Sequence, residues 1–112
     1  MYQELIRKIE AHPNYAPALR RAVAEQASLV LNYHTHGSGQ PYCVAICEKP
    51  RTLLPVLGQA EPLTELVHVK GLGQTAEQCL PLMEPLREEL IEHFQIQAPV
   101  QIYRDGRPLP AS

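Results

Sequence analysis

The chain has little of what several classes of protein require. It contains no tryptophan and one phenylalanine among 112 residues, and 5% of its residues are aromatic. Its uninterrupted apolar runs are far shorter than the roughly 20 residues of a transmembrane helix. The first residues have neither the basic segment nor the apolar run of a signal peptide. We therefore expect a cytoplasmic protein that does not associate with membranes.

The chain also lacks the strong positive charge of a nucleic-acid-binding domain. Its formal net charge is −2, and its aromatic residues are not interleaved with basic ones. Proteins that bind nucleic acids usually present a basic face, and those that bind single strands add aromatic side chains on which bases stack. We expect no nucleic-acid partner. The odd number of cysteines, three, favours free thiols in a reducing compartment over a disulfide framework.

No complete set of catalytic residues is recognisable. The single aspartate, Asp105, lies near the end of the chain. Cys43 or Cys47 could pair with a histidine as a thiolate nucleophile, but both lie within an apolar run, whereas reactive cysteines favour helix N-termini and electropositive clefts. The sequence does not decide whether the chain is an enzyme, but it favours a binding function, with no catalytic residue and no cofactor assigned.

Hydrophobic spacing predicts three helices. The first covers residues 2–11, and the second runs from Pro17 to the glycine-containing segment 34–39. The third begins after Thr75, a suitable N-cap residue. Two prolines lie inside its apolar stripe, at positions 81 and 85, and each removes a backbone hydrogen bond. We expect this helix to be kinked or divided there.

Strand patterns occupy the remainder of the chain. The apolar run 42–47 predicts a central strand, and residues 65–70 and 100–103 predict two more. Residues 51–57 are a possible edge strand, limited by the prolines around them. The predicted order is helix, helix, strand, possible strand, strand, helix, strand.

This order predicts an α+β fold in a single domain. We expect a two-layer sandwich in which a mixed sheet of three or four strands carries about three helices, mainly on one face. The domain is predicted to cover residues 1–104, and residues 105–112 to form a short C-terminal tail.

The first candidate site is the glycine loop between a predicted strand and a predicted helix. In this segment, Lys70, Gly71, Gly73 and Thr75 could present backbone N–H groups and side chains to an anion such as a phosphate or nucleotide. The loop matches neither the P-loop pattern nor the complete dinucleotide-binding pattern. A plain strand-to-helix turn is the competing interpretation, and it is the commoner one.

The second candidate site is the histidine pair His34 and His36. In an extended segment, both imidazoles would point the same way and could provide two ligands of a metal site. A polar loop after a helix is the competing interpretation. His68 has no partner that the sequence identifies, but its alternation with Leu66 and Lys70 places it on the less buried face of its strand.

The sequence therefore favours a non-enzymatic binding protein, acting as an accessory or regulatory subunit through protein–protein interaction. Apolar stripes on three helices are more than a thin sheet is expected to cover, which favours a protein partner or a homodimer. The alternatives are binding of a small anionic ligand at Lys70–Thr75 and binding of a metal at His34 and His36.

Overall fold

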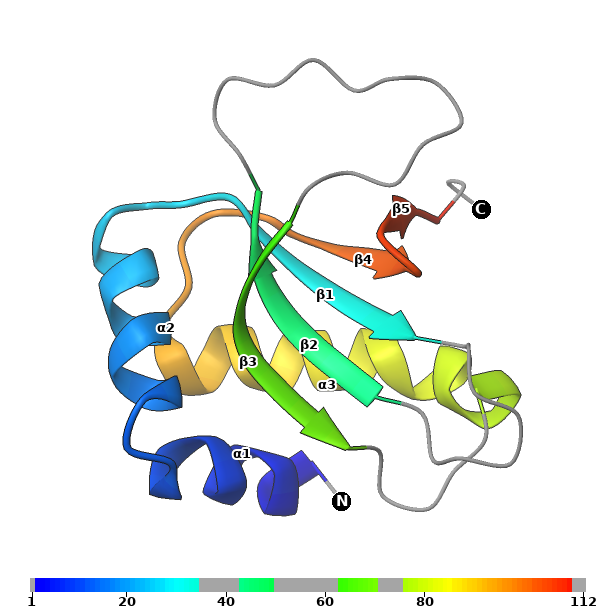
Figure 1. Cartoon of the computed structure of the whole chain (residues 1–112), viewed down its shortest axis with the longest axis horizontal. Helices are drawn as coiled ribbons and strands as arrows, with labels where there is room; N and C mark the ends of the chain where they lie inside the picture. Colours follow the sequence, from blue (N-terminus) through cyan, green and yellow to red (C-terminus); the bar gives the residue numbers. More distant parts are fainter. Residues whose placement is uncertain (1, 35–42, 50–62, 71–75, 110–112) are drawn as a thin grey trace.

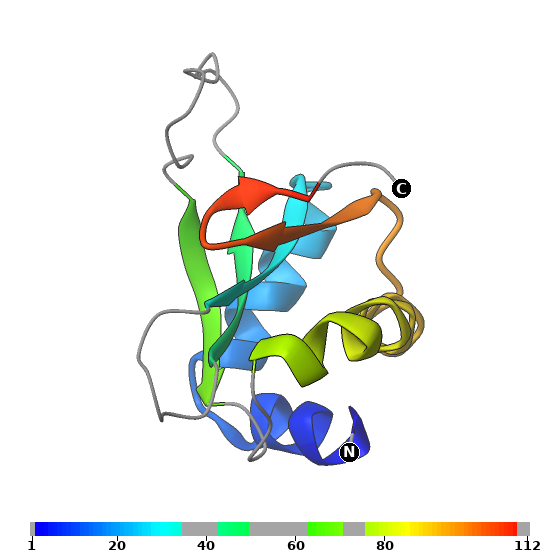
Figure 2. The ribbon, with the colours of Figure 1, turned by 90° about the vertical axis from the view of Figure 1, so that its right-hand side faces the viewer.

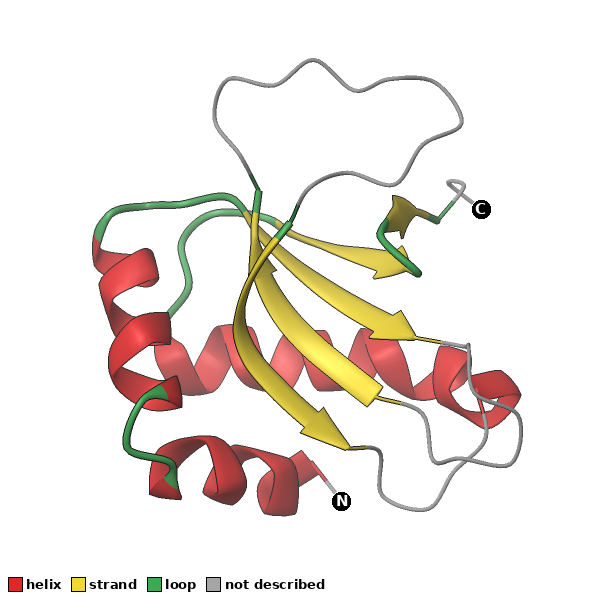
Figure 3. Ribbon diagram, viewed as in Figure 1, coloured by secondary structure: helices red, strands yellow, loops and turns green. Residues whose placement is uncertain are grey.

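The computed structural model describes residues 2–34, 43–49, 63–70 and 76–109 (Figure 1). The fold is α+β, as predicted, with a mixed sheet of five strands rather than three or four (Figure 3). The elements follow one another as α1 (Tyr2–Ala11), α2 (Tyr15–Ala24), β1 (Leu29–His34), β2 (Cys43–Glu48), β3 (Thr64–Lys70), α3 (Ala76–Phe94), β4 (Val100–Arg104) and β5 (Arg107–Pro108).

The strands lie in the order β3-β2-β1-β4-β5, so β1 is the central strand. Both β1 and β3 run antiparallel to β2, whereas β4 runs parallel to β1. It follows that β3 and β4 point in the same direction, as is usual for a strand–helix–strand unit. The carboxyl ends of β1, β3 and β4 therefore meet at one edge of the sheet, which is also where α3 begins (Figure 1).

The central strand occupies a segment that we predicted to be helical. The second helix ends at Ala24, and Gln26 adopts a left-handed conformation with φ 56°. The N–H groups of Gln26 and Ala27 then donate to the carbonyls of Val23 and Ala22, which closes the helix in a Schellman motif. The prediction of a helix through Val30 was wrong because no glycine marks this end.

The fifth strand comes from a hairpin at the start of the predicted tail. Asp105 and Gly106 both have positive φ, 51° and 80°, and Arg104 pairs with Arg107 on either side of them. Two positive φ values in a two-residue loop match the twist that joins adjacent antiparallel strands, and Asp-Gly suits that turn. The possible strand at residues 51–57 lies outside the described residues.

The last helix continues through both of its prolines, Pro81 and Pro85. Figure 2 shows its first turns inclined to the remainder, the bend that missing hydrogen bonds at proline produce. Within the described parts of the chain, no helix combines the length and the apolar character needed to cross a membrane.

All three helices pack on the same face of the sheet (Figure 2). Their apolar stripes are buried against it, so the described helices do not present the uncovered stripes that we expected. The buried helical residues are Leu5, Ile6 and Ile9 from α1, Ala16, Leu19 and Ala22 from α2, and Met83, Leu86, Leu90 and Phe94 from α3. The other face of the sheet carries none of these described helices.

Candidate functional site

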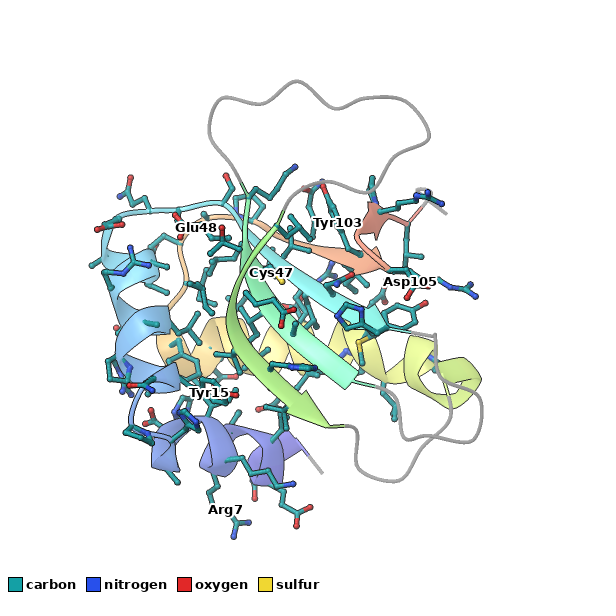
Figure 4. The ribbon with its side chains drawn as sticks, in the orientation of Figure 1. Arg7, Tyr15, Cys47, Glu48, Tyr103 and Asp105 are labelled. Atoms are coloured by element: carbon teal, nitrogen blue, oxygen red, sulfur yellow. The ribbon has the colours of Figure 1, made fainter. Side chains whose placement is uncertain are left out.

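We call the face of the sheet opposite the three helices the open face. Residues paired across neighbouring strands point to the same side of a sheet, so the register identifies which residues belong to it. One row across the sheet joins Glu65, Cys47, Val30 and Gln101, and the next joins His68, Ala45, Asn32 and Tyr103. Figure 4 labels Cys47 and Tyr103.

One half of the open face is a small apolar cluster separate from the main core. Val30, Ala45, Cys47 and Tyr103 are almost completely buried, and Leu63 packs against them. At its margin, the Lys49 ammonium lies 5.6 Å from the centre of the Tyr103 ring and donates a hydrogen bond of 3.0 Å to Gln101. This half of the open face is therefore already packed.

The other half carries four polar residues that we call the histidine cluster: Asn32, His34, Glu65 and His68. His34 and His68 come from β1 and β3, with β2 between them, yet their ring centroids lie 6.1 Å apart. The β2 residue in the row of His68 is Ala45, which has a small side chain. The two imidazoles can therefore approach each other across the middle strand.

Asn32 holds His34 in place from within the sheet. It is a buried polar side chain, 3% exposed, and its Oδ1 accepts a 2.9 Å hydrogen bond from the backbone N–H of Gly106. That contact turns Nδ2 toward Nε2 of His34, at 3.4 Å. An amide nitrogen can only donate, so these partners assign an unprotonated Nε2 to His34 and place its proton on Nδ1.

His68 is held by its own neighbours on the edge strand. Its Nδ1 lies 3.8 Å from Oε2 of Glu65, and its carbonyl accepts a 2.9 Å hydrogen bond from the hydroxyl of Tyr15 on α2. In the neutral ring, a carboxylate facing Nδ1 favours the tautomer with its proton on that nitrogen, which leaves Nε2 as the unprotonated one. About half of the His68 side chain is exposed to solvent (49%).

The structure brings together only part of what the sequence singled out. His34 lies in the histidine cluster, and its neighbour there is His68; His36 lies outside the described residues. Lys70 is the last residue of β3, opposite Cys43, but Gly71, Gly73 and Thr75 also lie outside the described residues. The partnership of His34 with His68 was missed because it depends on how three strands are arranged.

Cys47 belongs to the open face and is a neutral thiol. It is a free cysteine, buried in the apolar cluster. Burial, with a smaller contribution from the nearby Glu65 carboxylate, raises the pKa of its thiol from 9.0 to about 12. A thiol with this pKa is almost entirely protonated near neutral pH, so Cys47 does not supply a thiolate nucleophile.

The raised pKa of Cys47 predicts a loss of stability in alkaline solution. Because unfolding lowers the thiol pKa from about 12 to 9.0, deprotonation favours the unfolded chain. The stabilising contribution is complete below pH 9 and disappears as the pH rises toward 12. At about pH 10 we expect this effect to lower the free energy of unfolding by roughly 1 kcal/mol.

Denaturant unfolding at pH 8 to 11 measures this loss, with Cys47→Ala as the reference. Tyrosines and lysines titrate in the same range in both proteins, so the difference between the two pH profiles isolates Cys47. Parallel profiles for wild type and Cys47→Ala would contradict the burial of the thiol.

Comparisons of the chain with protein-family models, curated proteins and solved structures gave no match.

Proposed function

We propose that the protein is a non-enzymatic cytoplasmic binding protein, an accessory or regulatory subunit whose protein partner docks on the open face. The observation that carries this proposal is the one-sided packing of the helices, which leaves the other side of the sheet without a described helix (Figure 2). Three of the four strand pairings are antiparallel, and sheets of this kind commonly carry helices on one face and polar residues on the other. The middle of the open face is buried within the chain, so a partner would contact its exposed residues, Glu65, His68 and Gln101.

The groups exposed on this face determine the kind of partner that would fit. Glu65, His68 and Gln101 are exposed, whereas the apolar residues in the same rows of the sheet are buried within the chain. An interface made by such side chains is polar, and polar interfaces are typical of transient complexes, whereas obligate dimers bury more apolar surface. A transient partner protein therefore fits this face better than a permanent second copy of the chain.

The state of Cys47 argues against catalysis by a cysteine nucleophile. Because its thiol is buried and neutral, it does not form a thiolate–imidazole pair with a neighbouring histidine. The neighbouring histidines have polar partners that orient them, an arrangement that suits recognition of a partner through hydrogen bonds.

Binding of a small anion at Lys70–Thr75 stays a prediction from the sequence. The end of β3 at Lys70 and the start of α3 at Ala76 agree with a strand–loop–helix connection, and residues 71–75 lie outside the described residues. No contact described in the structure favours this alternative over partner docking.

Site-specific photo-crosslinking tests the proposal. A photoreactive amino acid is placed at Glu65 or Gln101 on the open face, and at Arg7 or Glu88 as matched controls on exposed positions of α1 and α3. Figure 4 shows Arg7 pointing away from the sheet. Irradiation in the cells that produce the protein, followed by mass spectrometry, should give one defined heterologous product from both open-face positions and none from the controls.

Two results would overturn docking at this face. Crosslinks from Arg7 or Glu88 without crosslinks from the open face would place the partner on the helical layer. A product of twice the chain mass of 12.6 kDa at Glu65 or Gln101 would show that a second copy occupies the face in place of a different protein.

A further inference from the structure

The two histidines of the histidine cluster lie close to the separation of a metal-binding pair. Their ring centroids lie 6.1 Å apart. Two imidazoles that bind one tetrahedral zinc ion, each through a nitrogen about 2 Å from the metal, have ring centres roughly 5 Å apart. A rotation of the half-exposed His68 side chain closes this difference.

Both histidines offer the same nitrogen. The contacts of His34 with Asn32 and of His68 with Glu65 both fit a neutral ring with its proton on Nδ1, in which Nε2 carries the lone pair. The 3.4 Å contact of Asn32 with His34 is long for a hydrogen bond, so a metal ion competes with it easily. The carboxylate facing Nδ1 of His68 is also the outer contact that commonly orients a metal-bound histidine.

We propose that Nε2 of His34 and Nε2 of His68 together bind a divalent first-row transition-metal ion, with copper(II) or zinc(II) as the preferred ions. Imidazole nitrogens favour these ions over magnesium and calcium, which take oxygen ligands. The described side chains contain no group of three or more histidine, cysteine, aspartate or glutamate residues arranged to hold a metal. The pair therefore supplies two ligands, and water or an incoming molecule completes the coordination.

This site differs from the one that the sequence suggested. The sequence paired His34 with its near neighbour His36. In the proposed site, the second ligand is His68, from a strand two positions away in the sheet. The metal site does not depend on partner docking, because its ligands belong to one chain and approach each other without a second molecule.

Metal titration of the chelator-stripped full-length chain tests the proposal. Copper(II) and zinc(II) are each titrated by calorimetry at about pH 8, where imidazole is neutral, and the copper complex is examined by electron paramagnetic resonance. We expect one equivalent to bind with a Kd on the order of micromolar, and the copper spectrum to show nitrogen ligands. His68→Gln and His34→Gln should each weaken binding by at least about tenfold.

The control is His93→Gln, because His93 is on α3 and its nearest charged partner is Glu10, at 3.5 Å. This variant should bind metal like wild type. Circular dichroism confirms that each variant is folded, and His68, on the exposed side of an edge strand, is the safer position to change. The absence of stoichiometric binding, or binding unchanged in His68→Gln, would overturn the proposal. So would a loss caused by His36→Gln but not by His68→Gln, since the pair suggested by the sequence would then hold the metal.

Discussion

Replacing Leu31 by alanine is expected to lower the free energy of unfolding by about 3 kcal/mol. Leu31 is fully buried (0% exposed) on the central strand β1, in the core between the sheet and the helices. Truncation removes apolar contacts and leaves a cavity that a central strand, held by neighbours on both sides, cannot easily collapse to fill. Domains of this size have roughly 5–15 kcal/mol of stability in total, so the melting temperature should fall by roughly 15 °C.

Urea or guanidinium unfolding, monitored by circular dichroism, measures the effect. The matched control is Leu66→Ala, because Leu66 is only partly buried and lies on the edge strand β3. Leu66→Ala should lower the free energy of unfolding by less than half as much as Leu31→Ala. The comparison also distinguishes the strand β1 from the helix that the sequence predicted for residues 29–33. In that helix, Leu31 would lie outside the apolar stripe, and its truncation would cost little stability. A loss below about 1 kcal/mol at Leu31 would favour that helix over β1.

Local patterns were sufficient to predict most of the elements. The first helix has the predicted bounds, and β2, β3 and β4 begin and end within one residue of the predicted strands. Each of these segments combines a clear apolar period with proline, glycine or charged residues at its ends, so pattern and boundary agree. The α+β class followed from these elements and their order.

The central strand could not be predicted in this way. Apolar residues at helical spacing continue from Leu19 to Val30, so the period itself does not reveal the change from helix to strand. The helix ends at a glutamine in the left-handed conformation, Gln26, and α3 ends in the same way at Gln95, with φ 54°. Glycine is the usual residue at this position, and a glutamine that takes its place gives no signal in the sequence.

The histidine cluster shows a second limit of local patterns. Simple alternation places Glu65 and His68 on opposite faces of β3, because they are three residues apart. The pairing of β2 with β3 shifts between Ile46 and Cys47, and this bulge brings Glu65 to the same face as His68. The approach of His34 likewise requires the strand order, which depends on long-range packing.

Replacing Asn32 by leucine is expected to lower the free energy of unfolding by about 2 kcal/mol. Its Oδ1 accepts the N–H of Gly106 and so joins the central strand β1 to the turn between β4 and β5. Leucine has a similar volume but cannot accept this bond, which leaves a partly buried donor without its partner. Removing one partner of a buried hydrogen bond costs more than the bond itself contributes, because the remaining group stays desolvated.

Amide hydrogen exchange separates this mechanism from a general loss of packing. In Asn32→Leu, the amide of Gly106 should exchange at least about tenfold faster than in wild type under conditions where the remainder of the sheet stays protected. Gln101→Leu is the control, because Gln101 is an exposed polar residue on the same face, and its replacement should leave Gly106 protected. If Gly106 exchanged at the wild-type rate in Asn32→Leu, the hydrogen bond to Asn32 would not be what holds the turn. The orientation of His34 would then need another cause, because the tautomer that exposes its Nε2 is assigned through the same asparagine.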